Sequence, residues 1–296
     1  MSLGSFAPLG LLLTACSPLT PYRTSVGVPV AAPPTSVGAP IAANTLGLGG
    51  SFNLQDLGVG NLAPEPGDPG LYASPYSMTA WGRVGIAGAL ELGIAGEYAP
   101  GESMRPGAAG VLPIPKDPSV YGVSVWTTGG YMWDRFGFGV TLEGTRLSMP
   151  YARYTYTGPE EYLNNGYYIG DDAGQFYTMS ESGRVHPIRV RGAGTFQARI
   201  DGWEIAAGFA AVPVFTNNGF SEEKAPIFRA GGLATGPVVD VGYDFGVMRV
   251  GGRFWYLIGA QHPTRGFDTG LGGSLSAEVR PFSAKEKPAE VHHPAP

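Results

Sequence analysis

Acid–base chemistry in this chain would depend on a few His and Asp residues beyond position 170. A histidine held beside a carboxylate can act as a general base on water or on a hydroxyl group. No His-x-Asp pair occurs, however, and serine-hydrolase and phosphate-loop patterns are absent. Solvated or hydrogen-bonded side chains are therefore the simpler interpretation. The candidates are Asp171, Asp172, His186, His262 and Asp268.

Metal and cofactor chemistry has little support in the sequence. A single Cys excludes a cysteine cage and an internal disulfide. Asp171-Asp172 alone offers too few ligands for Ca²⁺, and His292-His293 lies in a segment expected to be solvated. We expect neither a metal nor a cofactor.

The one cysteine, Cys16, lies in a sequence with its own chemistry. It ends a short apolar run, Leu9-Gly-Leu-Leu-Leu-Thr-Ala-Cys16, which is far too short for a transmembrane helix. The run resembles the bacterial lipoprotein signal and its lipobox, in which the Cys is acylated. The Lys or Arg that usually precedes such a run is missing. The resemblance implies a signal over residues 1–16 and lipidation at Cys16.

The composition excludes several classes of protein. Charged residues make up only 15% of the chain, and it contains 47 Gly and 27 Pro. Because Gly and Pro are unfavourable inside helices, an ordinary helical enzyme is excluded. Aromatic residues, at 11%, are too frequent for a disordered chain. A net charge of −5 offers no basic surface, so no nucleic-acid partner is expected.

The two ends of the chain differ from its middle. Residues 17–43 are rich in Pro, Ala, Ser, Thr and Val and carry one charge, Arg23, which predicts a disordered linker. Residues 283–296 are charged and contain Pro, which predicts a disordered tail. The folded domain is expected over residues 44–282.

In this middle region apolar residues recur at every second position, which is typical of strands with one apolar and one polar face. From Arg135 to Glu143, the residues Phe136, Phe138 and Val140 share a face. No helical pattern of similar length competes. Ten strands are predicted, near 44–54, 78–87, 90–98, 119–128, 131–147, 187–200, 203–215, 234–245, 248–258 and 269–282.

The connections between these strands alternate in length. The short links are predicted at Gly88, Gly129-Gly130, Asp201-Gly202 and Gly246-Val247, and the long ones at 55–77, 99–118, 148–186, 216–233 and 259–268. A transmembrane barrel has this rhythm, because its periplasmic turns are short and its outer loops are long. We therefore predict an all-β, antiparallel, up-and-down transmembrane β-barrel of about ten strands, within a range of 8–12. An even strand number places the N-terminus and the C-terminus together on the periplasmic side.

Two of the short links predict a register that can be checked against charge. Two-residue turns at Asp201-Gly202 and Gly246-Val247 place three Arg of the flanking strands opposite a carboxylate each. Opposite charges across a ladder contribute ~0.2–1 kcal/mol each. The lumen is thus predicted to be largely filled by Arg–carboxylate pairs, with the apolar face toward lipid. The pairs are Arg199 with Glu204, Asp240 with Arg253, and Asp244 with Arg249.

The middle of the chain, 44–282, resembles small bacterial outer-membrane β-barrel proteins, without a family-specific motif. One departure is that Phe282 is preceded at two-residue steps by Arg280 and Glu278 rather than by apolar residues. The resemblance implies a bacterial outer-membrane location and contact with outer-membrane lipids. Some ten-stranded barrels of this class are proteases with Asp and His at the outer rim. An omptin-like or lipid-modifying hydrolase is therefore the less favoured, enzymatic alternative.

The longest predicted outer loop, residues 148–186, is rich in Tyr, Gly and Asn. Tyr provides a large contact area at low entropic cost, so the loop is a candidate contact surface for an envelope or surface protein or a glycan. The alternative is a loop that folds over the barrel mouth with its tyrosines packed on one another. The tyrosines are Tyr151, Tyr154, Tyr156, Tyr162, Tyr167, Tyr168 and Tyr177.

Together these features predict a structural or surface-interaction role and no enzymatic activity. A narrow, porin-like channel for small or apolar solutes is the alternative, because inward Gly, Ala and Ser could leave water-filled space.

Overall fold

The computed structural model describes residues 22–29, 31–56, 71–73, 76–101, 117–160, 176–215, 230–259 and 269–282. The predicted signal over 1–16 and tail over 283–296 lie outside these ranges. Across the described part of the chain, no helix is long and apolar enough to span a membrane.

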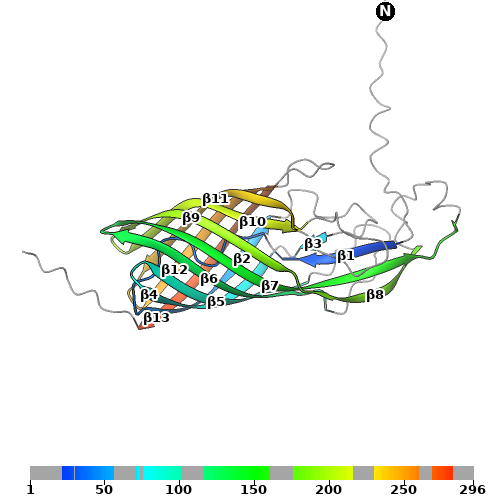
Figure 1. Cartoon of the computed structure of the whole chain (residues 1–296), viewed down its shortest axis with the longest axis horizontal. Coiled ribbons are helices and arrows are strands. Elements are labelled where there is room, and N and C mark those ends of the chain that lie inside the picture. The colour runs from blue at the N-terminus through cyan, green and yellow to red at the C-terminus, as the bar shows by residue number, and fades with distance from the viewer. Residues whose placement is uncertain are drawn as a thin grey trace, which may run out of the picture.

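Ten strands close into an antiparallel β-barrel, which confirms the predicted fold (Figure 1). Each strand pairs with its neighbour along the chain, and the barrel closes where the last strand pairs with the first. In order around the barrel they are β2 (Leu46–Asp56), β4 (Tyr76–Ala87), β5 (Leu90–Ala99), β6 (Val120–Trp133), β7 (Phe136–Tyr156), β9 (Ile188–Ile200), β10 (Trp203–Phe215), β11 (Ala230–Asp244), β12 (Met248–Ile258) and β13 (Thr269–Phe282).

Two hairpins have the register that counting from the turns predicts. Ile200 lies opposite Trp203, and Asp244 lies opposite Arg249. The turn residues Asp201 and Gly202 have φ values of 48° and 85°. Positive φ at both central positions defines the hairpin turn whose twist matches that of the strands.

The predicted turn at Gly129-Gly130 is wrong. The ladder continues past these glycines to Trp133, which lies opposite Phe136, and the chain reverses at Asp134-Arg135. Asp134 takes the positive φ, 51°, that the turn requires. The strand continues because Tyr131 and Trp133 extend its outward-facing alternation. Glycine inside a strand weakens it but does not have to end it.

The predicted outer loop 148–186 is also wrong where the structure describes it. β7 runs on past the barrel rim to Tyr156 and pairs there with β8 (Tyr177–Val185). On its other edge it pairs with β1 (Tyr22–Val28), and β1 in turn pairs in parallel with β3 (Leu71–Ala73). We call these four strands beyond the rim the extension (Figure 1). Tyr is a strand former, so the tyrosines of this region are compatible with strands that continue beyond the rim.

The segment between β1 and β2 is not a disordered linker. Residues 31–45, which we call the lumen segment, lie inside the barrel, and most of them are buried. Composition misled here because a Pro/Ala-rich segment cannot form a core of its own, yet it can pack in a cavity that the rest of the chain supplies.

The described ends of the chain lie at opposite ends of the barrel. β1 pairs with β7 beyond the long-loop rim, whereas β2 begins and β13 ends beside the short turns. The prediction that both termini leave from one side is therefore wrong for Tyr22 and Phe282. It failed because it treated the residues before β2 as external to the barrel.

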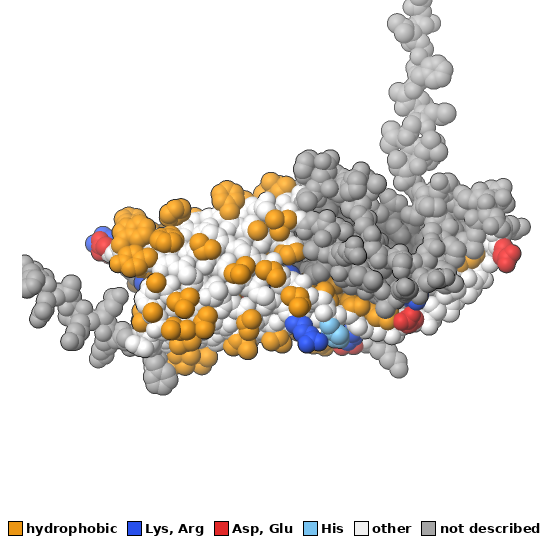
Figure 2. Space-filling model, viewed as in Figure 1, with side chains coloured by type: hydrophobic (Ala, Val, Ile, Leu, Met, Phe, Trp, Pro, Cys, Tyr) orange, Lys and Arg blue, Asp and Glu red, His pale blue; other side chains and the backbone are white. Residues whose placement is uncertain are grey.

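The barrel carries apolar side chains on its outside (Figure 2), whereas most of the charged side chains of its strands are buried inside. On β6, for example, Tyr121, Val123 and Val125 are exposed, while Ser124 and Trp126 between them are buried. Among the ten strands' outward side chains that the structure describes, only Arg146, at the long-loop rim, is charged. This is the reverse of a water-soluble barrel.

Candidate functional site

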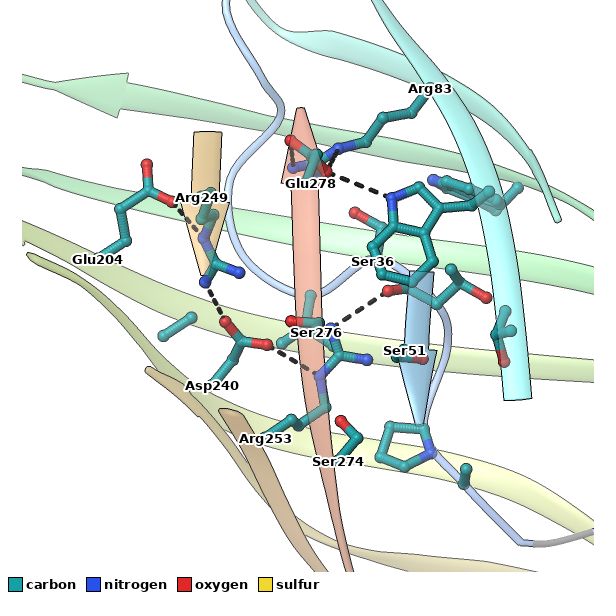
Figure 3. A pocket seen from close by; sticks show the side chains of 18 of the residues that line it. Ser36, Ser51, Arg83, Glu204, Asp240, Arg249, Arg253, Ser274, Ser276 and Glu278 are labelled. Carbon is teal, nitrogen blue, oxygen red and sulfur yellow. Dashed lines mark hydrogen bonds and ion pairs between the residues drawn. The ribbon is translucent and has the colours of Figure 1, made fainter. Parts of the chain in front are cut away.

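The lumen contains a network of paired charges supplied by eight of the ten barrel strands. Figure 3 shows the part of it around Asp240 and Glu278. The charged side chains occupy inward positions because side chains alternate along each strand. The two signs balance, one for one. The cations are Arg83, Arg189, Arg191, Arg199, Arg249, Arg253 and Arg280, and the anions are Glu91, Glu97, Glu143, Glu204, Asp240, Asp244 and Glu278.

One part of this network is centred on Glu278 of β13. Its carboxylate lies 2.7 Å from Nε of Arg83 and 2.8 Å from Nε of Arg280. Arg83 also lies 3.1 Å from Glu91, and Arg280 lies 2.5 Å from Asp244. A continuous row of ion pairs thus joins β5 to β11 across the closing strands of the barrel.

The neighbouring part contains two of the three predicted pairs, whereas the predicted pairing of Asp244 with Arg249 is wrong, because both side chains have other partners. Arg199 lies 3.1 Å from Glu204, and Arg253 lies 3.0 Å from Asp240. Arg249, although opposite Asp244 in the ladder, binds Glu204 at 2.8 Å and also Asp240. Backbone register fixes which residues lie opposite one another, but the long Arg side chain can reach a carboxylate at another position.

A second cluster, whose side chains are more completely buried, lies nearer the long-loop end of the barrel. Arg189, which is 1% exposed, binds Glu97 at 2.5 Å, and Arg191 binds Glu143 at 2.5 Å. Arg191 also lies 3.8 Å from Glu97, which joins the two pairs. Breaking one buried pair of this kind leaves an unpaired charge and typically costs ~3–5 kcal/mol.

The lumen segment donates its backbone amides to barrel side chains. Thr35 N binds Glu143 at 2.6 Å, Gly38 N binds Thr195 at 3.0 Å, and Ala39 N binds Gln197 at 2.7 Å. Nearer the short turns, Ile41 N and Ser36 Oγ both donate to Glu91, at 3.1 and 2.8 Å. These bonds satisfy backbone groups that neither a helix nor a sheet satisfies.

Backbone carbonyls of the same segment accept hydrogen bonds from barrel arginines. Arg191 donates to the carbonyl of Ala32 at 3.3 Å. Arg253 donates to Pro34 at 2.7 Å and to Thr35 at 3.1 Å. An uncharged segment therefore contacts both charge clusters without unbalancing either, since it offers only peptide groups and side-chain hydroxyls.

Apolar contacts hold the N-terminal half of the lumen segment. Ala32 packs in a buried cluster on the inner wall of the barrel, and Ala31 and Val37 pack against its edge. The wall residues are Ala193, Ala210, Val212, Ala234, Val238, Trp255 and Leu257.

A separate apolar cluster lies at the long-loop mouth. Val26 of β1 is fully buried and packs with Leu147, Met149, Val120 and their neighbours at the rim. β1 thus packs against one side of the long-loop rim, and the lumen segment that follows it occupies the barrel interior.

A polar cavity of about 60 Å³ remains beside the lumen segment. Ser51, Ser274 and Ser276 of the closing strands form part of its wall (Figure 3). Trp255 also lines it, and its buried indole N–H has no hydrogen-bond partner among the described residues. A polar space of this size can hold water, which would satisfy that donor.

The tyrosines predicted to form a contact surface are mostly buried within the extension. Tyr151, Tyr154 and Tyr177 are at most 8% exposed, whereas Tyr156 is half-buried and packs on Tyr177. Tyr162, Tyr167 and Tyr168 lie outside the described residues. For the buried three, a contact surface is the wrong interpretation, and packing within the folded extension is the correct one.

Two of these phenols have raised pKa values. Burial raises the pKa of Tyr154 to about 12, because the phenolate would be poorly solvated. The hydrogen bond that Tyr151 donates to Glu181, 2.6 Å long, raises the pKa of Tyr151, with burial adding to the effect.

The structure assembles no acid–base site from the residues it describes. His186 is exposed in the link between β8 and β9, and Asp171, Asp172, His262 and Asp268 lie outside the described residues. Within the same limits, no three His, Cys, Asp or Glu side chains form a group able to hold a metal ion. Cys16 also falls outside the described part.

The sequence analysis missed the lumen segment, although three inward glycines signal it. A Cβ on Gly139 would lie 1.8 Å from the carbonyl oxygen of Gly38, and one on Gly85 would lie 2.1 Å from that of Ala42. At Gly130 it would lie 2.2 Å from the carbonyl oxygen of Phe138 on the paired strand and 3.0 Å from Pro40. Glycine at these inward positions makes room for another length of backbone.

No protein-family model matches the chain, and no curated protein matches it. Solved structures of bacterial outer-membrane barrels do resemble it. The outer membrane protease OmpT from Escherichia coli has a TM-score of 0.35 and 10% identity, covering 88% of this chain and 95% of that one. The CymD monoaromatic hydrocarbon channel has a TM-score of 0.33 and 12% identity, covering 81% of this chain and 89% of the channel. The N-terminal β-barrel domain of Pseudomonas aeruginosa OprF has a TM-score of 0.27 and 6% identity, covering 80% of this chain and 99% of that domain. Likenesses this weak carry no information about chemistry.

Proposed function

We propose that this chain is an outer-membrane barrel lipoprotein, acylated at Cys16, whose lumen is sealed by its own residues 31–45. Its role is structural or interactive: the barrel fixes the extension at the outer membrane surface, where an envelope or surface protein is its partner. The observation that carries the proposal is the occupied lumen inside an apolar outer wall.

The outer wall supports a membrane location through its height as well as its chemistry. Tyr121 and Tyr131 both face outward on β6 and are ten positions apart. At ~3.3 Å per residue and a tilt of ~40°, they stand ~25 Å apart along the barrel axis. That is the height of the apolar band between the aromatic girdles of outer-membrane barrels.

Aromatic contacts support a girdle at each end of this band. At the short-turn end, Trp203 packs on Tyr243, which packs on Phe245. At the long-loop end, Tyr98 packs on Tyr121. Aromatic rings are favoured at this level because one edge is apolar and the hydroxyl or N–H reaches polar headgroups.

A structural role is favoured over conduction because the lumen segment obstructs the passage. The segment is held by side chains on several strands and by the apolar cluster around Ala32, and β1, which precedes it, packs at the long-loop rim. An open passage for solutes would require the displacement of all these contacts.

A narrow channel is the second candidate, and the cavity beside the lumen segment is the observation in its favour. Ser51, Ser274 and Ser276 line that side of the lumen with small hydroxyl groups. Displacement of the lumen segment would widen this polar space into a passage.

Conductance in planar lipid bilayers tests the seal and separates the two candidates. The full chain is expected to be closed. Ala32→Asp places an unpaired charge in the buried apolar cluster, so the segment should leave the lumen and current should appear. Ala42→Asp is the matched control, because Ala42 is exposed in the same segment, and it should stay closed. Equal currents from all three proteins would contradict the seal and favour the channel.

Cell fractionation tests the membrane and anchor parts of the proposal. We expect the protein in the outer-membrane fraction, with a band that migrates differently before and after boiling and a diacylated N-terminal peptide beginning at Cys16. A soluble protein with no heat shift would exclude the membrane barrel. An unmodified Cys16 in a heat-modifiable membrane protein would exclude only the anchor.

A further inference from the structure

The described part of the chain begins and ends at opposite ends of the barrel. In β1, Tyr22 lies opposite Thr155, nine positions beyond the rim residue Arg146 on β7. Leu46, the first residue of β2, lies opposite Val84 beside the short turn at Gly88. Between Tyr22 and Leu46 the chain therefore passes from beyond one end of the barrel to the other.

The hydrogen bonds of the lumen segment follow this passage in order. Arg191, in the upper lumen, binds the carbonyl of Ala32. Further along, Gly38 binds Thr195. Asn44 N finally reaches the carbonyl of Gly85, next to the short turn. The route is inside the barrel, because these partners are inward side chains and a backbone group at the short-turn rim.

A crossing through lipid outside the barrel is excluded on physical grounds. Residues 31–45 form neither a helix nor a strand, so their amides and carbonyls would be unpaired in hydrocarbon. Each such group would cost several kcal/mol there. In the lumen, Glu143, Gln197, Glu91 and Arg253 satisfy them.

We propose that the protein is threaded through its own barrel, so that the chain before Tyr22 is displayed on the cell surface while the chain after Phe282 leaves on the periplasmic side. This rests on the proposed membrane barrel, with its long loops outside. It reverses the expected placement of the N-terminus and gives the lipid anchor a particular leaflet.

The reach of the chain decides which leaflet that is. Cys16 precedes Tyr22 by six residues, and six residues span at most ~20 Å when fully extended. The apolar band is ~25 Å high, and Tyr22 already lies beyond its outer edge. Cys16 therefore cannot reach the periplasmic interface, and its acyl chains insert in the outer leaflet.

The experiment compares the accessibility of two epitope tags on intact cells. One tag is inserted between Ser17 and Pro18, after the anchor, and the matched tag follows Pro296. An antibody is expected to label the first tag on intact cells and the second only after permeabilisation. Both tagged proteins must be heat-modifiable in the outer-membrane fraction, which shows that the barrel has formed before the labelling is interpreted.

Each other result overturns a stated part of the proposal. Two tags that both require permeabilisation, or two that are both labelled on intact cells, would place the termini on one side and exclude threading. Reversed labelling, with only the C-terminal tag outside, would exclude surface display of the N-terminus. Loss of the heat-modifiable barrel in the untagged protein would instead refute the proposed function itself.

Discussion

The backbone amide of Thr35 donates a 2.6 Å hydrogen bond to Glu143, a strand residue 108 positions later in the chain. The same carboxylate binds Arg191 at 2.5 Å through its other oxygen. Glu143 thus serves two purposes: it neutralises a buried cation and it holds the lumen segment. A change at this one side chain should weaken the barrel wall and its occupant together.

Glu143→Gln should lower the free energy of unfolding by ~3–5 kcal/mol, the usual cost of breaking a fully buried ion pair. Arg191 would keep its charge and lose its main partner. Urea unfolding in detergent micelles, followed by tryptophan fluorescence, measures the change. The control Glu160→Gln removes an exposed carboxylate and should stay within ~0.5 kcal/mol of the unmodified protein. Equal midpoints for both variants would show that the pair contributes little.

Gly139→Ala should displace the lumen segment, because the new Cβ would lie 1.8 Å from the carbonyl oxygen of Gly38. Overpacking of this kind costs ~1–3 kcal/mol when the structure shifts to relieve it. Gly144→Ala, on the same strand, is the control, since its Cβ would meet nothing within 4 Å. Bilayer conductance and heat-modifiability should change for the first variant alone. A closed, fully stable Gly139→Ala protein would argue against the observed path of the segment.

Val125→Arg tests the apolar band, because this side chain is 62% exposed near the middle of β6. In a bilayer the substitution should cost ~2–4 kcal/mol, as for an arginine at the midplane of a barrel. Gly88→Arg, at a short turn with open space around it, should cost ~0–1 kcal/mol. Unfolding from lipid vesicles compares the two. Equal costs would mean that Val125 faces water.

Tyr154 should be among the last tyrosines to ionise, with a pKa near 12 rather than 10. Because its folded pKa lies above its unfolded value, its contribution to stability is complete below pH ~10 and is lost as the pH rises toward 12. The raised pKa of Tyr151 acts in the same direction. Absorbance at an ultraviolet phenolate band follows the titration. Tyr154→Phe should remove the late component; a titration unchanged by that substitution would assign it to another residue.

Strand periodicity predicted the barrel well. The alternation of apolar and polar residues can be read within each strand, without knowing which strands lie beside it. The register around Asp201-Gly202 followed from turn geometry alone. The partner exchange of Arg249 did not, because a long side chain selects among carboxylates in three dimensions. The lumen segment was missed for a related reason: its bonds join Gly38 to Thr195 and Ala39 to Gln197, more than 150 positions apart.

The position of the lumen segment also constrains the order of assembly. The barrel closes where β2 pairs with β13, so the first strand cannot complete its pairing until the last strand has been added. Residues 31–45 immediately precede β2, and β1 is already fastened to β7 on the far side of the mouth. If the sheet curled shut first, a free end would have to be pushed through a narrow, crowded tube. We expect instead that the sheet wraps around the segment while the seam is still open, so that the occupant of the lumen serves as the core on which the wall closes.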